Sequence, residues 1–158
     1  GFGMIWLRRP VGGSAEARAS EAGVGASTGL WQRFEELTGE VQQPLGPMIG
    51  RTAERALAVR TGPAAVTEQT LIAPEDVTEE RYQRFGAQHP EVILARQGGG
   101  FRRVRPVSSA AAGLLGAADG EFTVSQLITA VASLIDVEEE SLRDEALDLY
   151  VEGFLTHP

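Results

Sequence analysis

Apolar residues recur with helical spacing over five segments of the chain. In the first, Leu30, Phe34 and Leu37 lie at i, i+4 and i+7, the spacing that places side chains on one face of a helix. Ser108 and Thr123 precede two later segments and are residue types that begin helices. The periodicity predicts helices over residues 30–37, 48–60, 109–118, 124–135 and 138–152.

Shorter apolar segments, bounded by glycine and proline, have the character of strands. Residues 91–97 and 101–107 flank three consecutive glycines and therefore predict a β-hairpin. The remaining expectations are strands over 68–73 and 154–156, an irregular segment over 74–80 and a turn at Asp119-Gly120.

The order of these elements predicts an α+β fold. A hairpin followed by three helices and a short strand is the order of a winged-helix-like module, which we expect over residues 67–158. A helical connector over residues 28–66 precedes it, and residues 11–27 are expected to form a flexible linker because they are rich in glycine, alanine and serine. Residues 1–10 predict an isolated strand that belongs to a fold continuing upstream.

The charge balance disfavours general nucleic-acid binding. The chain has 14 basic and 22 acidic residues and a formal net charge of -8, whereas phosphate recognition needs a basic surface. Lysine is absent, and the abundance of arginine, alanine and glycine is typical of GC-rich coding, as in actinobacteria.

The composition also bears on the compartment. Cysteine is absent, which excludes disulfides and thiolate metal sites and fits a cytoplasmic protein. No apolar run approaches the roughly 20 residues that span a bilayer, so no membrane association is expected. The N-terminal segment lacks the pattern of a signal peptide.

The chain carries no motif typical of catalysis or cofactor binding. The serines 108, 109, 125 and 133 lie outside any G-x-S-x-G elbow, and the glycines 98–100 lack the lysine of a phosphate-binding loop. His89 and His157 are far apart in sequence and have no metal-ligand spacing. We therefore predict no catalytic, cofactor-binding or metal-binding residue in this chain.

One local charge asymmetry suggests a binding surface. Arg96, Arg102, Arg103 and Arg105 lie on or beside the predicted hairpin, with no acidic residue between the first and the last. They are our candidates for binding an anionic partner. The alternative is that they pair with the acidic helices of the same domain, because residues 119–158 contain many carboxylates and a single arginine.

The segments EVILARQGGGFRRVRPV, AAGLLGAADGEFTVSQLITAVASLIDVEEESL and LYVEGFL carry a family resemblance. Together they resemble the C-terminal domain of actinobacterial class I S-adenosylmethionine-dependent methyltransferases, which are similar to HemK-type enzymes. GFGMIWLRRP is similar to the last strand of their Rossmann-like catalytic domain, and PLGPMIG fits the linker that follows. The family's glycine-rich cofactor loop and its Asn-Pro-Pro-Tyr/Phe motif are not in this chain, so no catalytic or cofactor residue is carried over.

The resemblance implies a non-catalytic accessory domain that dimerises or recruits the protein or nucleic-acid substrate of a methyltransferase. Its partners would be its own catalytic domain, a second copy of itself or that substrate, and S-adenosylmethionine would be the cofactor of the parent enzyme. Two alternatives remain at this stage. They are a free-standing peptide-binding module of the winged-helix or chaperone type, and a nucleic-acid-binding domain that uses the four arginines.

Overall fold

The computed structural model describes residues 33–35 and 40–158. Residues 36–158 belong to one compact unit, and residues 33–35 belong to another. The predicted N-terminal strand and linker, and most of the predicted 30–37 helix, lie outside the described residues. The part of that helix that is described, residues 33–35, has no helical structure, so the prediction is wrong there.

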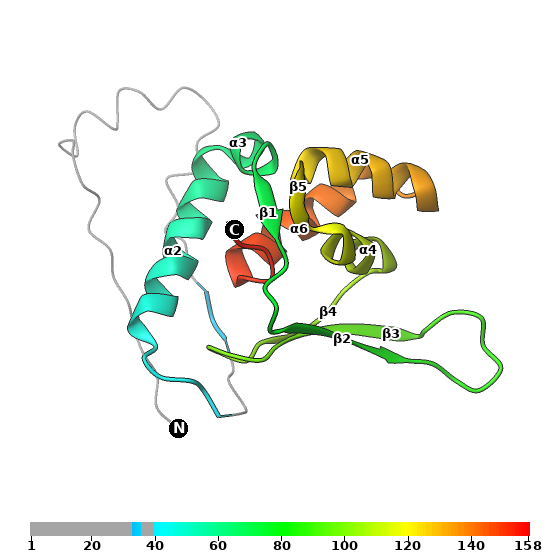
Figure 1. Ribbon diagram of the computed structural model, residues 1–158, viewed down its shortest axis with the longest axis horizontal. Coiled ribbons are helices and arrows are strands. Elements are labelled where there is room, and N and C mark those ends of the chain that lie inside the picture. The colour runs from blue at the N-terminus through cyan, green and yellow to red at the C-terminus, as the bar shows by residue number, and fades with distance from the viewer. Residues whose placement is uncertain (1–32, 36–39) are drawn as a thin grey trace. The chain divides into compact units, whose positions relative to one another are not determined.

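The described residues form a mixed α and β structure, as the α+β prediction requires (Figure 1). The helices are α2 (Gly46–Thr61), α3 (Pro63–Thr67), α4 (Ser109–Ala117), α5 (Val124–Ile135) and α6 (Glu139–Glu152). The strands are β1 (Thr70–Ile72), β2 (Val77–Tyr82), β3 (Val92–Gln97), β4 (Val104–Pro106) and β5 (Asp119–Thr123).

The helix starts follow from their capping residues. The Ser108 hydroxyl accepts a hydrogen bond from the Ala111 amide and begins α4. Thr123 and Gln126 form a reciprocal capping box at the start of α5, which satisfies backbone amides that the helix itself leaves unpaired. Gly153 ends α6 with a φ of 90°, a left-handed conformation that glycine adopts without steric cost.

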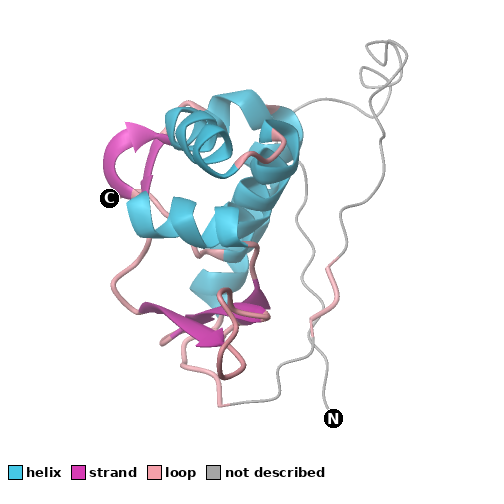
Figure 2. Cartoon of the chain, turned by 90° about the vertical axis from the view of Figure 1, so that its right-hand side faces the viewer, coloured by secondary structure: helices cyan, strands magenta, loops and turns pink. Residues whose placement is uncertain are grey.

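The core lies where α4, α5 and α6 pack on one another and where α2 and α3 pack on α6. Helices supply the greater part of it, and the β1–β5 pair closes one side (Figure 2). Its largest fully buried side chains are Phe154, Leu71, Leu114, Ile128, Leu149 and Leu155.

The strands form two antiparallel sheets. The predicted hairpin is confirmed, because β3 pairs with β4 through Leu94↔Pro106 and Arg96↔Val104. The second sheet joins β1 to β5, and an isolated bridge from Ile72 to Thr156 adds the chain terminus to β1. That bridge is all that forms of the strand expected over 154–156.

Two segments expected to be irregular are strands. Residues 77–82 form β2, which pairs with β3 along its whole length. Its sequence, VTEERY, lacks apolar alternation because most of its side chains are exposed, so only the ladder to β3 identifies it as a strand. Asp119-Gly120 opens β5, and Gly120 has a φ of 90°. The segment expected to be a turn is therefore part of a strand, although Gly120 has a left-handed backbone. The pairing of this strand with β1 contains a register shift.

The same substitution at two leucines, one buried and one exposed, tests how the helices are packed. Leu114 on α4 is 0% exposed, whereas Leu134, within the helix predicted over residues 124–135, is 83% exposed. Leu114→Ala should lower the free energy of unfolding by about 2–5 kcal/mol, because it removes buried methyl groups and leaves a cavity. Leu134→Ala should change it by less than about 0.5 kcal/mol. Urea denaturation followed by circular dichroism measures both, and equal losses would contradict the placement of α5.

Candidate binding cleft

A cleft of about 430 Å³ lies between α2, the turn that joins β3 to β4 and the C-terminal end of α6. This volume is in the range of small-ligand pockets. Its lining includes Met48, Arg51 and Arg55 on α2, Gly100, Phe101 and Arg103 on the turn, and Glu152 and Gly153 at the end of α6.

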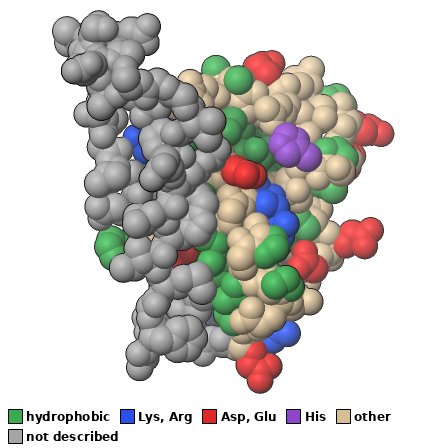
Figure 3. Space-filling view, turned by 90° about the vertical axis from the view of Figure 1, so that its left-hand side faces the viewer, with side chains coloured by type: hydrophobic (Ala, Val, Ile, Leu, Met, Phe, Trp, Pro, Cys, Tyr) green, Lys and Arg blue, Asp and Glu red, His purple; other side chains and the backbone are tan. Residues whose placement is uncertain are grey.

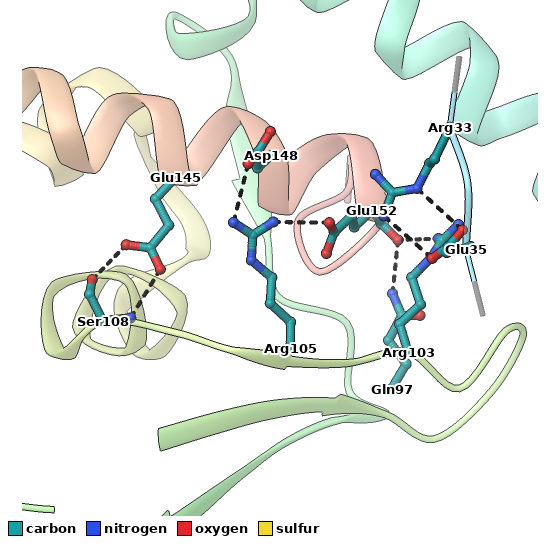
Figure 4. A network of polar contacts seen from close by, with 9 residues as sticks. All are labelled: Arg33, Glu35, Gln97, Arg103, Arg105, Ser108, Glu145, Asp148 and Glu152. Atoms are coloured by element: carbon teal, nitrogen blue, oxygen red, sulfur yellow. Dashed lines mark hydrogen bonds and ion pairs between the residues drawn. The ribbon is translucent and has the colours of Figure 1, made fainter. Parts of the chain in front are cut away.

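The base of the cleft is held by the last carbonyl group of α6. Glu152 O accepts a hydrogen bond from Gln97 Nε2 at 3.0 Å and another from Arg103 Nη1 at 2.6 Å (Figure 4). A carbonyl oxygen at a helix C-terminus has no helical donor and carries partial negative charge, so it favours a cationic donor. Arg103 is buried, and its guanidinium also lies 4.5 Å from the centroid of the Phe101 ring.

Hydrogen bonds from two other segments hold the β3–β4 turn in place. The Gly98 amide donates to Asp76 O, and the Gly99 amide donates to Asp76 Oδ2, both at 2.8 Å. The Gln42 amide donates to Gly100 O at 2.8 Å. Gly100 has a φ of 63°, and a Cβ atom there would lie 2.6 Å from Met48 Sδ. Glycine therefore permits the turn to lie directly against α2.

Two further arginines line the α2 wall. Arg55 is partly buried, and its Cζ lies 5.6 Å from the centroid of the Tyr150 ring. A Cβ atom on Gly153 would lie 2.6 Å from Arg55 Nη1, so the guanidinium rests on the glycine that ends α6. Arg51 lies one helical turn before it and is exposed.

The electrostatic environment of Arg55 is unusual for a partly buried cation. Desolvation lowers the pKa of its guanidinium, Tyr150 raises that pKa, and the positive charges of Arg51 and Arg103 lower it further. Arginine stays protonated in proteins, so Arg55 keeps its positive charge although its charged neighbours Arg51 and Arg103 are also positive. Among residues 33–35 and 40–158, no carboxylate forms an ion pair with Arg51 or Arg55.

The four arginines of the predicted surface are divided among different environments. Arg96 on β3 pairs with Glu80 on β2, with a shortest N–O distance of 2.6 Å. Arg105 on β4 pairs with Asp148 and Glu152 of α6 at 3.2 and 3.0 Å. Arg103 binds the α6 terminus, and Arg102 lies exposed in the turn with a φ of 50°. Only Arg103 lies in the cleft.

The alternative that these arginines pair with the acidic helices of the same domain therefore describes Arg105, whereas Arg96 pairs with a strand residue, Glu80. A role of the four in partner binding stays a prediction. Basic side chains on the described part of one face lie interspersed with acidic and hydrophobic ones (Figure 3). Sequence reasoning missed Arg51 and Arg55. Their signal was two arginines four residues apart on a predicted helix, where like charges are close enough to repel.

The histidines stay apart in the structure. His89 is exposed, and His157 contacts Tyr150 edge to face, with 6.0 Å between the ring centroids. The described residues contain no group of three or more potential metal ligands. No helix in the same part of the chain is long and apolar enough to cross a membrane.

No family model matches the chain, and no curated protein matches it.

The Glu80–Arg96 pair predicts a pH dependence. Hydrogen bonds from Arg96 and then Tyr82 lower the pKa of the Glu80 carboxyl. A lowered folded-state pKa stabilises the fold above the pKa of the unfolded chain, and this contribution is lost as pH falls through the folded-state pKa. Arg96→Gln should therefore raise the Glu80 pKa toward its ordinary value, as measured by carboxyl ¹³C NMR titration. Arg84→Gln, which breaks the separate pair with Glu91, should leave it unchanged; the same shift in both variants would refute the assignment.

Proposed function

We propose that this chain is a non-catalytic, winged-helix-type accessory module of an S-adenosylmethionine-dependent methyltransferase, and that it recruits the molecule to be methylated. The methyltransferase part of this proposal is supported by the resemblance carried by residues 91–155 and by GFGMIWLRRP. The recruitment part is supported by the cleft.

The arrangement of the C-terminal elements supports the winged-helix assignment. A helix, a strand and two helices follow in order as α4, β5, α5 and α6, and the chain then returns to bridge Ile72 through Thr156. β1 consequently lies between β5 and the chain terminus. The β3–β4 hairpin precedes these helices in sequence, and β3 packs against α4.

One observation carries the recruitment role: two arginines of α2, which form no ion pair with a carboxylate of the described residues, line a cleft of ligand size. Arg51 and Arg55 come from a helix, and the turn that faces them is about fifty residues away in sequence. A fold that concentrates guanidinium groups in a cleft is equipped to bind an anionic group. Arg96 and Arg105 are matched by carboxylates, which weighs against a broad surface for nucleic acid.

The proposal makes a genetic and a kinetic prediction. The reading frame upstream of Gly1 should encode a methyltransferase domain with its cofactor loop. Deleting residues 36–158 from that parent protein should raise the KM for its macromolecular substrate about tenfold or more, because recruitment energy is lost, and leave the KM for S-adenosylmethionine unchanged. Steady-state methyl-transfer assays with the substrate and the cofactor varied separately measure both constants.

The isolated 158-residue chain provides the matching control. Calorimetric titration with S-adenosylmethionine should release no binding heat, since the cofactor belongs to the parent's catalytic domain. Binding of the cofactor to this chain would overturn the accessory role. An unchanged substrate KM in the deletion variant would overturn recruitment.

A further inference from the structure

We propose that the cleft binds an acidic peptide segment, with Arg51 and Arg55 holding the carboxylate of an aspartate or glutamate side chain. This inference deepens the proposed recruitment role and rests on it, because it takes the recruited molecule to be a protein. It assigns a ligand class to the cleft and a function to two arginines outside the hairpin.

The first step of the argument is the charge of α2. The helix contains three arginines and one glutamate, and Arg51 and Arg55 are four residues apart, a spacing at which like charges destabilise a helix. Arg55 is partly withdrawn from water against Tyr150 and Gly153. A partly desolvated cation is costly unless an anion accompanies it. A bound carboxylate would remove both the repulsion and the cost of desolvation.

The second step is that the cleft's own carboxylates face other partners. Asp76 Oδ2 accepts the Gly99 amide at 2.8 Å, and Glu152 Oε1 accepts Arg105 Nη1 at 3.0 Å. The first bond holds the β3–β4 turn and directs the Asp76 carboxylate at the backbone. The second holds β4 and directs the Glu152 carboxylate at Arg105. Neither carboxylate neutralises Arg51 or Arg55, so both arginines are open to an anion from outside the described residues.

The third step concerns the shape and the neutral lining. A planar guanidinium group matches the two oxygens of a carboxylate, and the cleft offers two such groups on one wall. The cleft also exposes apolar side chains and an amide, which suit the aliphatic and backbone groups that flank an acidic residue in a peptide. These neutral lining residues include Gln42, Pro44, Pro47, Met48 and Phe101.

The fourth step separates a peptide from a nucleic acid. A nucleic-acid strand needs a basic track with several stacking aromatics. The cleft has one aromatic side chain, Phe101, which the buried Arg103 already covers, and the chain has a net charge of -8. A single acidic side chain enters a local basic cleft without requiring a basic surface around it.

The test is an NMR titration of the complete 158-residue chain, observing the arginine Nε–Hε signals. The probe is an acetylated and amidated Gly-Glu-Leu-Glu-Gly peptide, and its neutral counterpart is Gly-Gln-Leu-Gln-Gly. The blocked ends ensure that any response comes from the side-chain carboxylates. The acidic peptide should shift the signals of Arg51 and Arg55, and the neutral peptide should not. Raising the salt concentration should weaken binding.

Three variants locate the site. Arg55→Gln and Arg51→Gln should each weaken binding of the acidic peptide about tenfold or more, because each removes a charge-assisted contact. Arg102→Gln removes an equal charge from the exposed part of the turn, outside the cleft lining, and should change affinity less than about twofold. Thermal melts establish whether each variant is folded. If Arg55→Gln is unstable, Arg51→Gln still tests the site, because it alters only an exposed side chain.

Several outcomes would overturn the inference. They are equal binding of the two peptides, an equal loss in Arg102→Gln, absence of any shift at millimolar peptide, or stronger shifts with a thymidine dodecanucleotide, which would assign the cleft to nucleic acid. The recruitment role is judged separately by the deletion assay. If deletion raises the substrate KM while the acidic peptide fails to bind, recruitment stands and the peptide assignment falls.

Discussion

The last carbonyl oxygen of α6 is the constraint on which the cleft depends. A helix must leave its terminal carbonyl groups without helical donors, and here Glu152 O is satisfied by Gln97 at the end of β3 and by Arg103 in the β3–β4 turn. These bonds bring the β3–β4 hairpin onto the end of the helix. The same terminus contains Gly153, whose lack of a side chain admits the guanidinium of Arg55. One helix end thus positions both walls of the cleft.

α6 can position the walls of the cleft because one of its faces packs in the core and another carries carboxylates that bind neighbouring elements. Buried side chains such as Leu142 and Leu149 anchor one face in the core. Glu145, Asp148 and Glu152 lie at i, i+3 and i+7 on another face, where they receive Ser108 and Arg105 (Figure 4). The acidic face joins the start of α4 and strand β4 to the same rigid element, and it engages Arg105, one of the four arginines of the predicted binding surface.

Local chemistry made much of the fold predictable. Ser108 and Thr123 begin helices, and Gly153 ends one, because capping depends on neighbouring residues alone. The errors come from long-range pairing. β2 is a strand only because β3 lies beside it, and the Asp119-Gly120 segment is a strand only because β1 does. The solvent exposure of Leu134 near the end of α5 likewise follows from where the core stops, which periodicity does not encode.

The candidate site was predictable only in part, for the same reason. Arg103 was identified as a member of a basic segment, and the structure places it in the cleft. Arg51 and Arg55 could not be connected with it, because they lie on a helix about fifty residues earlier and meet the turn only through the packing of α2 on α6. The pairing of Arg105 with α6 is equally invisible along the chain. A sequence shows where the charged residues are, but only the tertiary structure shows which of them form ion pairs.

β2 has a consequence for how copies of this protein behave in a crowded solution. It lies at the edge of its sheet, and an exposed edge strand offers backbone groups that another chain can extend into an aggregate. Residues Glu79, Glu80 and Arg81 within it are all charged, and charged side chains on an edge strand disfavour its pairing with another edge. The polar sequence that concealed this strand from pattern analysis therefore also disfavours extension of the sheet through this edge.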